Sequence, residues 1–119
     1  MSDKAEKVLS LVINKAMMVG KVAELKEIHA EMDKGVKFLS LSTGRFVAEY
    51  GARVPINSAY KATKLISKTV SDMMKKRDAK NFSPTETSTP MTEEAQKLYS
   101  FFHEQMSLVR ISIASAEKR

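Results

Sequence analysis

The sequence predicts an all-α protein, a compact bundle of three to four helices built by a single domain spanning residues 1–119. Of the 119 residues, 43% are hydrophobic, which is enough for one core. Only four glycines and three prolines interrupt a chain rich in residues that favour helix. Apolar residues recur every three or four positions, the period of an amphipathic helix. We expect helices at about 3–34, 36–50, 58–80 and 92–117.

The first predicted helix, residues 3–34, is long and amphipathic. Gly35 follows Lys34 and provides the expected stop, because glycine accepts the left-handed conformation that often ends a helix. One apolar stripe is expected to be buried along this helix, made of Val8, Leu11, Val12, Met18, Val19, Val22, Leu25, Ile28 and Met32.

Residues 36–50 are the most ambiguous segment. Their apolar spacing fits a helix, but the serines and the threonine between residues 40 and 43 weaken it, and residues 36–42 fit an extended chain as well. Gly51 and Pro55 then break any helix, and Asn57 or Ser58 can cap the next one.

The last two predicted helices flank a flexible linker rich in Ser, Thr and Pro, residues 81–92. In the helix before the linker, small and apolar residues occupy one arc and lysines the opposite arc. Thr92 can cap the helix after it. The buried stripe expected in that final helix consists of Ala95, Leu98, Phe102, Met106, Val109 and Ile113.

No pattern of catalytic, cofactor-binding or metal-ligating residues is recognisable, so we expect a non-enzymatic protein without a cofactor. There is no cysteine, the two histidines lack partners at metal-ligand spacing, and the glycines are too dispersed for a phosphate-binding loop. Glu24, Glu27 and Glu31 are interpreted as a solvated helix face. We expect neither a signal peptide nor a transmembrane segment, and an intracellular (cytoplasmic) location.

The charge distribution favours nucleic acid as a partner. The net charge is +6, and residues 59–81 contain seven Lys or Arg against two Asp. A lysine stripe on one helix suits phosphates without reading bases, so DNA and RNA are equally compatible. A solvated amphipathic helix has the same appearance. The predicted contacts are Lys61, Lys64, Lys68, Lys75, Lys76 and Arg77.

The alternative is a helical protein–protein interaction module: an adaptor, an inhibitor, or a subunit of a larger assembly. Its lysines would meet an acidic protein surface, and apolar side chains beyond the main stripes would bind a partner helix or a second copy in a homo-oligomer. The predicted apolar contacts are Tyr99, Phe101 and Leu108, with Met17, Met18 and Ile111 also outside or beside the stripes. The same residues fit an ordinary, wider core. Attachment to a membrane surface is the weakest interpretation, because the apolar face of the lysine-rich helix is diluted by Ala and Thr.

Overall fold

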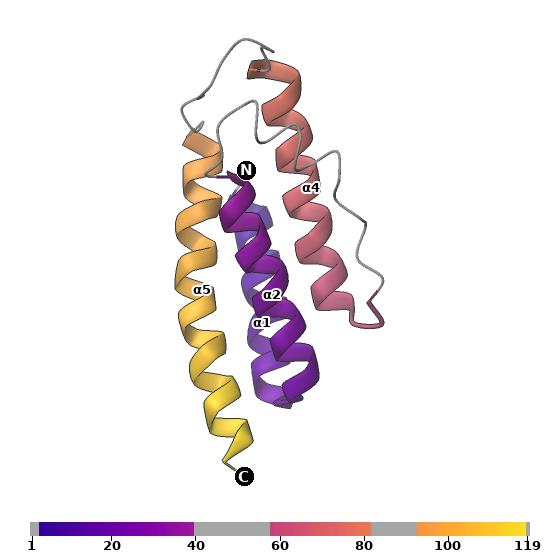
Figure 1. The fold of residues 1–119 in the computed structure, drawn as a ribbon, viewed down its shortest axis with the longest axis vertical. Coiled ribbons are helices and arrows are strands. Elements are labelled where there is room, and N and C mark those ends of the chain that lie inside the picture. Colours follow the sequence, from indigo (N-terminus) through magenta and orange to yellow (C-terminus); the bar gives the residue numbers. More distant parts are fainter. Residues whose placement is uncertain (1–2, 40–57, 82–92, 119) are drawn as a thin grey trace.

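The computed structural model describes residues 3–39, 58–81 and 93–118. These ranges form four helices and contain no strand: α1 (Asp3–Val19), α2 (Val22–Leu39), α4 (Lys61–Asn81) and α5 (Glu93–Glu117) (Figure 1). The helices pack side by side with their axes roughly aligned. The predicted all-α bundle is therefore confirmed.

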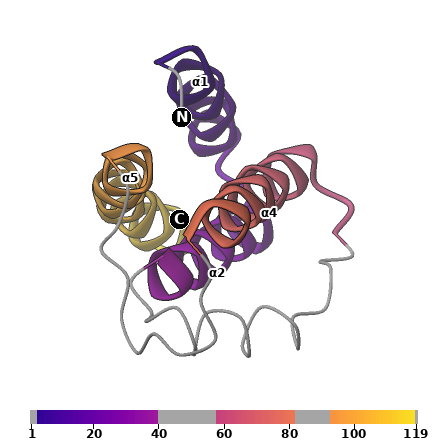
Figure 2. The same cartoon turned by 90° about the horizontal axis from the view of Figure 1, so that it is seen from above.

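Helix α2 lies between α4 and α5 and packs extensively against both (Figure 2). Helix α1 lies opposite α2, across α4 and α5, and contacts α4 and α5 less than α2 does. The helices α1 and α5 run down the bundle as drawn in Figure 1, and α2 and α4 run up it. Helices α1 and α5 are therefore parallel, and the start of each lies at the same end of the bundle.

The core is made of one apolar row from each helix. Every row has the three- and four-residue spacing of a helix that buries a single face. Full burial of one such side chain contributes about 1.5–3 kcal/mol. The core residues are Leu9, Ile13 and Ala16 of α1; Leu25, Ile28, Met32 and Val36 of α2; Ala62, Ile66 and Val70 of α4; and Leu98, Phe102, Met106 and Val109 of α5.

The prediction of one helix over 3–34 is wrong, because the chain breaks at Gly20. This glycine has a φ of 71°, in the left-handed region that side-chain-bearing residues rarely adopt. Its N–H donates to the Ala16 carbonyl at 3.0 Å, which ends α1 with a left-handed cap. The stop expected at Gly35 therefore lies fifteen residues earlier, at Gly20.

Gly35 has a different role, inside α2 and not after it. A Cβ at this position would lie 2.8 Å from Val70 Cγ2 and 3.0 Å from Phe102 Cε2. The missing side chain therefore allows α2 to approach α4 and α5 closely. Residues 36–39 continue α2, so neither a separate helix starting at residue 36 nor an extended chain there is correct. The remainder of the predicted 36–50 helix lies outside the described residues.

The other two predicted helices agree with the structure to within a few residues. Helix α4 starts three residues later than predicted and ends at Asn81, and α5 starts one residue later and ends at residue 117 as predicted. Asn81, the first residue assigned to the linker, is the last residue of α4, and the other linker residues lie outside the described ranges.

Candidate binding surfaces

The outer side of α4 carries three of the six predicted basic contacts. Lys61, Lys64 and Lys68 are exposed, and Ala62, Ile66 and Val70 are buried on the inner side. None of these three lysines takes part in an ion pair with another described residue. Asp72, also exposed, lies one turn after Lys68 and reduces the positive charge of the row.

The other three predicted contacts, Lys75, Lys76 and Arg77, belong to the second half of α4. Their backbone is helical, and their side chains lie outside the described part of the structure. The structure thus brings Lys61, Lys64 and Lys68 onto one exposed row, and leaves the contribution of the other three as a prediction.

The start of α4 is fixed against α2 by a part-buried hydrogen-bond network. The Ser58 hydroxyl donates to Glu27 Oε2 at 2.7 Å and accepts from the Tyr60 N–H at 3.1 Å. Ser58 was one of the two residues predicted to cap this helix, and it is the one that accepts a hydrogen bond from a backbone amide at the helix start. Lys21 Nζ lies 5.5 Å from the centre of the Tyr60 ring, close enough for a cation–π contact.

The glutamates of α2 are not the solvated face that their charge suggested. Glu24 and Glu27 are half-buried, and Glu31 is only 1% exposed, with Oε2 3.8 Å from Lys34 Nζ. Glu27 points toward α4, as its bond to Ser58 shows. These positions face a neighbouring helix because α2 is packed on two sides, by α4 and by α5. Periodicity could not reveal that second contact.

The three predicted apolar contacts have different environments. Tyr99 and Phe101 are half-buried and pack against the core, and Leu108 is 46% exposed. Tyr99 also meets His103 edge-on, with ring centres 4.6 Å apart. Leu108 is therefore the member of this set that is most available to a partner.

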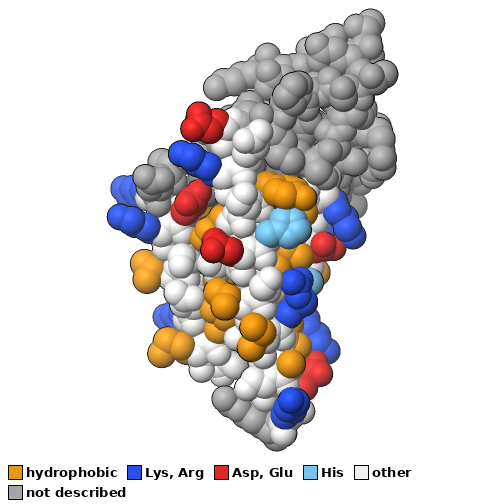
Figure 3. Space-filling model, turned by 90° about the vertical axis from the view of Figure 1, so that its left-hand side faces the viewer, with side chains coloured by type: hydrophobic (Ala, Val, Ile, Leu, Met, Phe, Trp, Pro, Cys, Tyr) orange, Lys and Arg blue, Asp and Glu red, His pale blue; other side chains and the backbone are white. Residues whose placement is uncertain are grey.

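The most exposed apolar side chains are ones assigned to the buried stripe of the first helix. Met18 is 88% exposed, Leu11 69% and Val19 65%, and Val8 is also exposed. The expectation that they are buried is wrong, because α1 turns the row of Leu9, Ile13 and Ala16 inward instead. On α5, Ile111 is 66% exposed, one turn from Leu108. Figure 3 shows hydrophobic side chains gathered over the lower part of the described surface on this side.

Two shallow hollows follow the junction of α1 and α5. The upper one has a volume of about 480 Å³ and is lined by Glu6 of α1 and by residues 93–104 of α5, including Glu104 and Phe101. The lower one, about 230 Å³, is lined by Met17 and Gly20 together with α5 residues around Ile111. The shared linings place the start of α1 beside the first half of α5, and the end of α1 beside Ile111.

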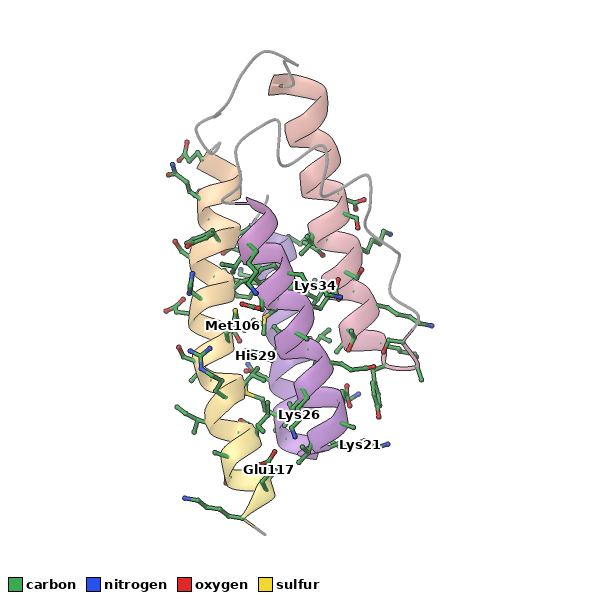
Figure 4. The ribbon with its side chains drawn as sticks, viewed as in Figure 1. Lys21, Lys26, His29, Lys34, Met106 and Glu117 are labelled. Atoms are coloured by element: carbon green, nitrogen blue, oxygen red, sulfur yellow. The ribbon has the colours of Figure 1, made fainter. Side chains whose placement is uncertain are left out.

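Of the two histidines, His29 makes a contact between helices. Its Nε2 accepts a hydrogen bond from Arg110 Nη1 at 3.1 Å, joining α2 to α5. Partial burial and then the Arg110 guanidinium lower the pKa of His29 from its ordinary value of 6.5, while Asp33 opposes them. In Figure 4, His29 lies above the pair formed by Lys26 and Glu117, whose Nζ and Oε1 are 3.0 Å apart.

No family model, curated protein or solved structure matches the chain. Within the described ranges, no group of three or more His, Asp or Glu side chains is arranged to hold a metal ion. No helix in the same ranges is both long enough and apolar enough to span a membrane.

Proposed function

We propose that this chain is a non-enzymatic helical protein–protein interaction module that binds its partner through the outer sides of α1 and α5. The observation that carries the proposal is the exposure of Leu11, Met18 and Ile111, each at least 66% accessible, on two helices whose inner sides are already packed. Together with Leu108 they form what we call the α1–α5 face. Large apolar side chains gathered on one side of a small domain are typical of an interaction site.

The energetics support the same conclusion. Burying one of these side chains against a partner is worth about 1.5–3 kcal/mol, and the backbone beneath them is already helical. Little conformational entropy is therefore lost in the backbone on binding. Leu108 and Ile111 are three residues apart and Leu11 and Met18 seven, and both spacings occur among the anchor residues by which one helix packs against another.

The test is site-specific photocrosslinking in an extract of the source cells. A photoreactive phenylalanine analogue replaces Met18 on the α1–α5 face in one variant and Lys64 on the outer side of α4 in the matched control. We expect protein adducts from position 18 and few from position 64. Protein adducts at equal yield from both positions, or none from position 18, would contradict the proposal.

A second candidate function, binding to nucleic acid through α4, is favoured by one specific observation. Lys61, Lys64 and Lys68 are exposed in one row and form no ion pair with any described residue. Ammonium groups in that state can contact phosphates and release counterions. The nearby Asp72 weakens this surface and is the reason it ranks second.

Fluorescence anisotropy with a DNA duplex and with an RNA strand tests the second candidate. Changing Lys61, Lys64 and Lys68 to Glu is expected to abolish binding, and each phosphate contact removed lowers the salt slope by about 0.9 for duplex DNA. The matched control changes Lys4, Lys7 and Lys15 of α1 to Glu, which alters the net charge equally. Loss of binding in both variants would indicate attraction to net charge and not to the α4 row.

A further inference from the structure

We infer that α1 is a hinged helix, which opens away from α2, α4 and α5 as a unit by turning about Gly20. Closure of α1 assembles the α1–α5 face, and opening takes that face apart. The consequence for binding rests on the proposed function, because it concerns the same face. The opening itself follows from the way α1 is packed and connected.

Helix α1 is the least enclosed of the four described helices. It lies at one edge of the bundle in Figure 2, and its contacts with α2, α4 and α5 are less extensive than those of α2 with α4 and α5. Val12 and Met17 are only partly buried against the core. Opening α1 therefore breaks less apolar contact than separating α2 from either of its neighbours. The buried row that holds α1 closed consists of Leu9, Ile13 and the small Ala16.

The seam between α1 and α5 is unfilled at both ends. The upper hollow, of about 480 Å³, lies between Glu6 and the first half of α5. The lower hollow, of about 230 Å³, lies between Met17 and the part of α5 around Ile111. Side chains inside a protein normally fill such spaces to the density of an organic crystal. Fewer dispersion contacts therefore hold α1 against α5 at either end of the seam.

The other three helices are joined by polar contacts as well as by the core. The Ser58 hydroxyl donates to Glu27 at 2.7 Å between the start of α4 and α2, and Arg110 of α5 donates to His29 of α2 at 3.1 Å. The first of these bonds anchors α4, whose buried apolar row is as short as that of α1. Helices α2, α4 and α5 are thus expected to stay together when α1 opens.

The connection between α1 and α2 supplies the hinge. It consists of residues 20 and 21. Gly20 has a φ of 71°, and a glycine can leave or enter this conformation without a side-chain clash. Lys21 Nζ lies 5.5 Å from the centre of the Tyr60 ring, which holds the beginning of α2 beside the start of α4. The movement is therefore confined to Gly20, at the end of a helix, where hinges commonly lie.

Opening divides the α1–α5 face into two halves. Leu11 and Met18 move with α1, whereas Leu108 and Ile111 stay on α5. A partner that contacts both halves binds only the closed state, so the closed fraction of the chain sets its apparent affinity.

Native-state hydrogen exchange of the purified full chain, at increasing concentrations of urea below the unfolding transition, tests the opening. A detached helix of 17 residues is marginal in water, so its amides exchange once it opens. Amides of residues 9–16 in α1 are expected to exchange at least about tenfold faster than those of residues 25–36 in α2. Their dependence on urea should also be weaker, because opening exposes less surface than global unfolding. Equal rates and equal urea dependence in the two helices would overturn the inference.

A chemical tether between α1 and α5 tests the movement directly. Glu6→Cys and Ser100→Cys are joined by a flexible bismaleimide, since both positions line the upper hollow and the chain has no native cysteine. The tether holds the end of α1 far from Gly20, so exchange of residues 9–16 should slow at least about tenfold. The matched control joins Ser100→Cys to Glu104→Cys, which line the same hollow from α5 alone, and it should leave α1 exchange fast. Equal slowing by both tethers, or slowing by neither, would overturn the inference.

Photocrosslinking in the cell extract from a photoreactive analogue at position 18 tests the consequence for binding. Ile13→Ala removes buried contact that holds α1 closed, so adducts should decrease, and the tether between positions 6 and 100 should restore them. Circular dichroism checks that this variant remains folded. Adducts that do not decrease in Ile13→Ala, while hydrogen exchange shows α1 open, would refute control of the face by closure. Fast exchange of α1 without adducts in any variant would refute the proposed function and leave the opening standing.

Discussion

Helices α1 and α2 follow each other after two connecting residues and differ in length by one residue. Both bury an apolar row, yet they differ in the other side chains that they bury or expose. Helix α1 exposes Leu11 and Met18, whereas α2 buries Glu31. The difference follows from position in the bundle. Helix α2 lies between α4 and α5 in an extensive contact, and α1 contacts the same two helices less. Apolar spacing indicates that a helix has a buried side, but the number of neighbours decides how much of its circumference is buried.

The largest expected effect comes from comparing the same residue type in the two helices. Leu25 of α2 is fully buried, and Leu11 of α1 is 69% exposed. Leu25→Ala is expected to lower the free energy of unfolding by about 2–5 kcal/mol, because it removes apolar contact and leaves a cavity. Leu11→Ala should change it by no more than about 0.5 kcal/mol.

Urea denaturation followed by circular dichroism measures both values. Equal losses from the two substitutions would show that α1 buries the row that was expected from the sequence, and that the comparison between α1 and α2 is wrong.

The same two helices show how far the sequence could predict the fold. The ends of α4 and α5 could be placed because Pro55, Ser58 and the Ser/Thr/Pro-rich segment are local signals. The break at Gly20 was missed because the apolar spacing continues across it, and a glycine inside a helix costs only about 1 kcal/mol. Gly35 looked like a stop, but its function depends on Val70 and Phe102, which are distant in sequence.

The candidate surfaces also differ in how well the sequence could predict which of their residues are exposed. The exposure of Lys61, Lys64 and Lys68 was predictable, because they lie opposite the apolar arc of their own helix. The exposure of Leu11 and Met18 was not, since α1 has apolar residues on two sides and only packing selects the inner row. A residue-level signal existed for Ile111 and Leu108, which lie outside the main stripe of α5, and for Met18, which also lies beside the stripe of the first helix.

The second prediction concerns the close packing of α2 at Gly35. Gly35→Ala adds a Cβ 2.8 Å from Val70 Cγ2. We expect a net destabilisation of about 1–2 kcal/mol, because overpacking typically costs about 1–3 kcal/mol and the gain in helix propensity, about 1 kcal/mol, only partly offsets it. Calorimetric or urea unfolding would measure this loss.

A double-mutant cycle with Val70→Ala sharpens this test. Removing the Val70 methyl groups relieves part of the clash, so the double variant should lose less stability than the two single losses added together. Simple additivity, or a Gly35→Ala variant more stable than the wild type, would show that α2 does not depend on a close approach at this glycine.

The third prediction is the contribution of the Ser58 hydroxyl to the α2–α4 contact. Ser58→Ala removes the bonds to Glu27 and to the Tyr60 amide. It should cost about 1–2 kcal/mol, the usual range for a helix cap whose loss also leaves a polar group without its partner. Ser107→Ala is the matched control, because Ser107 is exposed on α5, and it should be nearly neutral. A neutral Ser58→Ala would remove this network as a determinant of where α4 starts.

The smallest expected effect is a pH dependence from the contact between His29 and Arg110. The pKa of His29 is lowered in the folded chain, by partial burial first and by Arg110 second. Between its ordinary value of 6.5 and the lowered value, the unfolded chain therefore binds more protons than the folded chain. The stabilising contribution is fully present above pH 6.5 and is lost as the pH falls through the folded pKa.

Urea midpoints measured at intervals from neutral to mildly acidic pH should thus decrease more in the wild type than in His29→Gln, which cannot titrate. Arg110→Gln removes the second cause of the lowered pKa and is expected to reduce the pH dependence without abolishing it, because burial of His29 remains. A wild type whose stability rises relative to His29→Gln as the pH falls would mean that Asp33, which favours the protonated ring, outweighs burial and Arg110 at the α2–α5 contact.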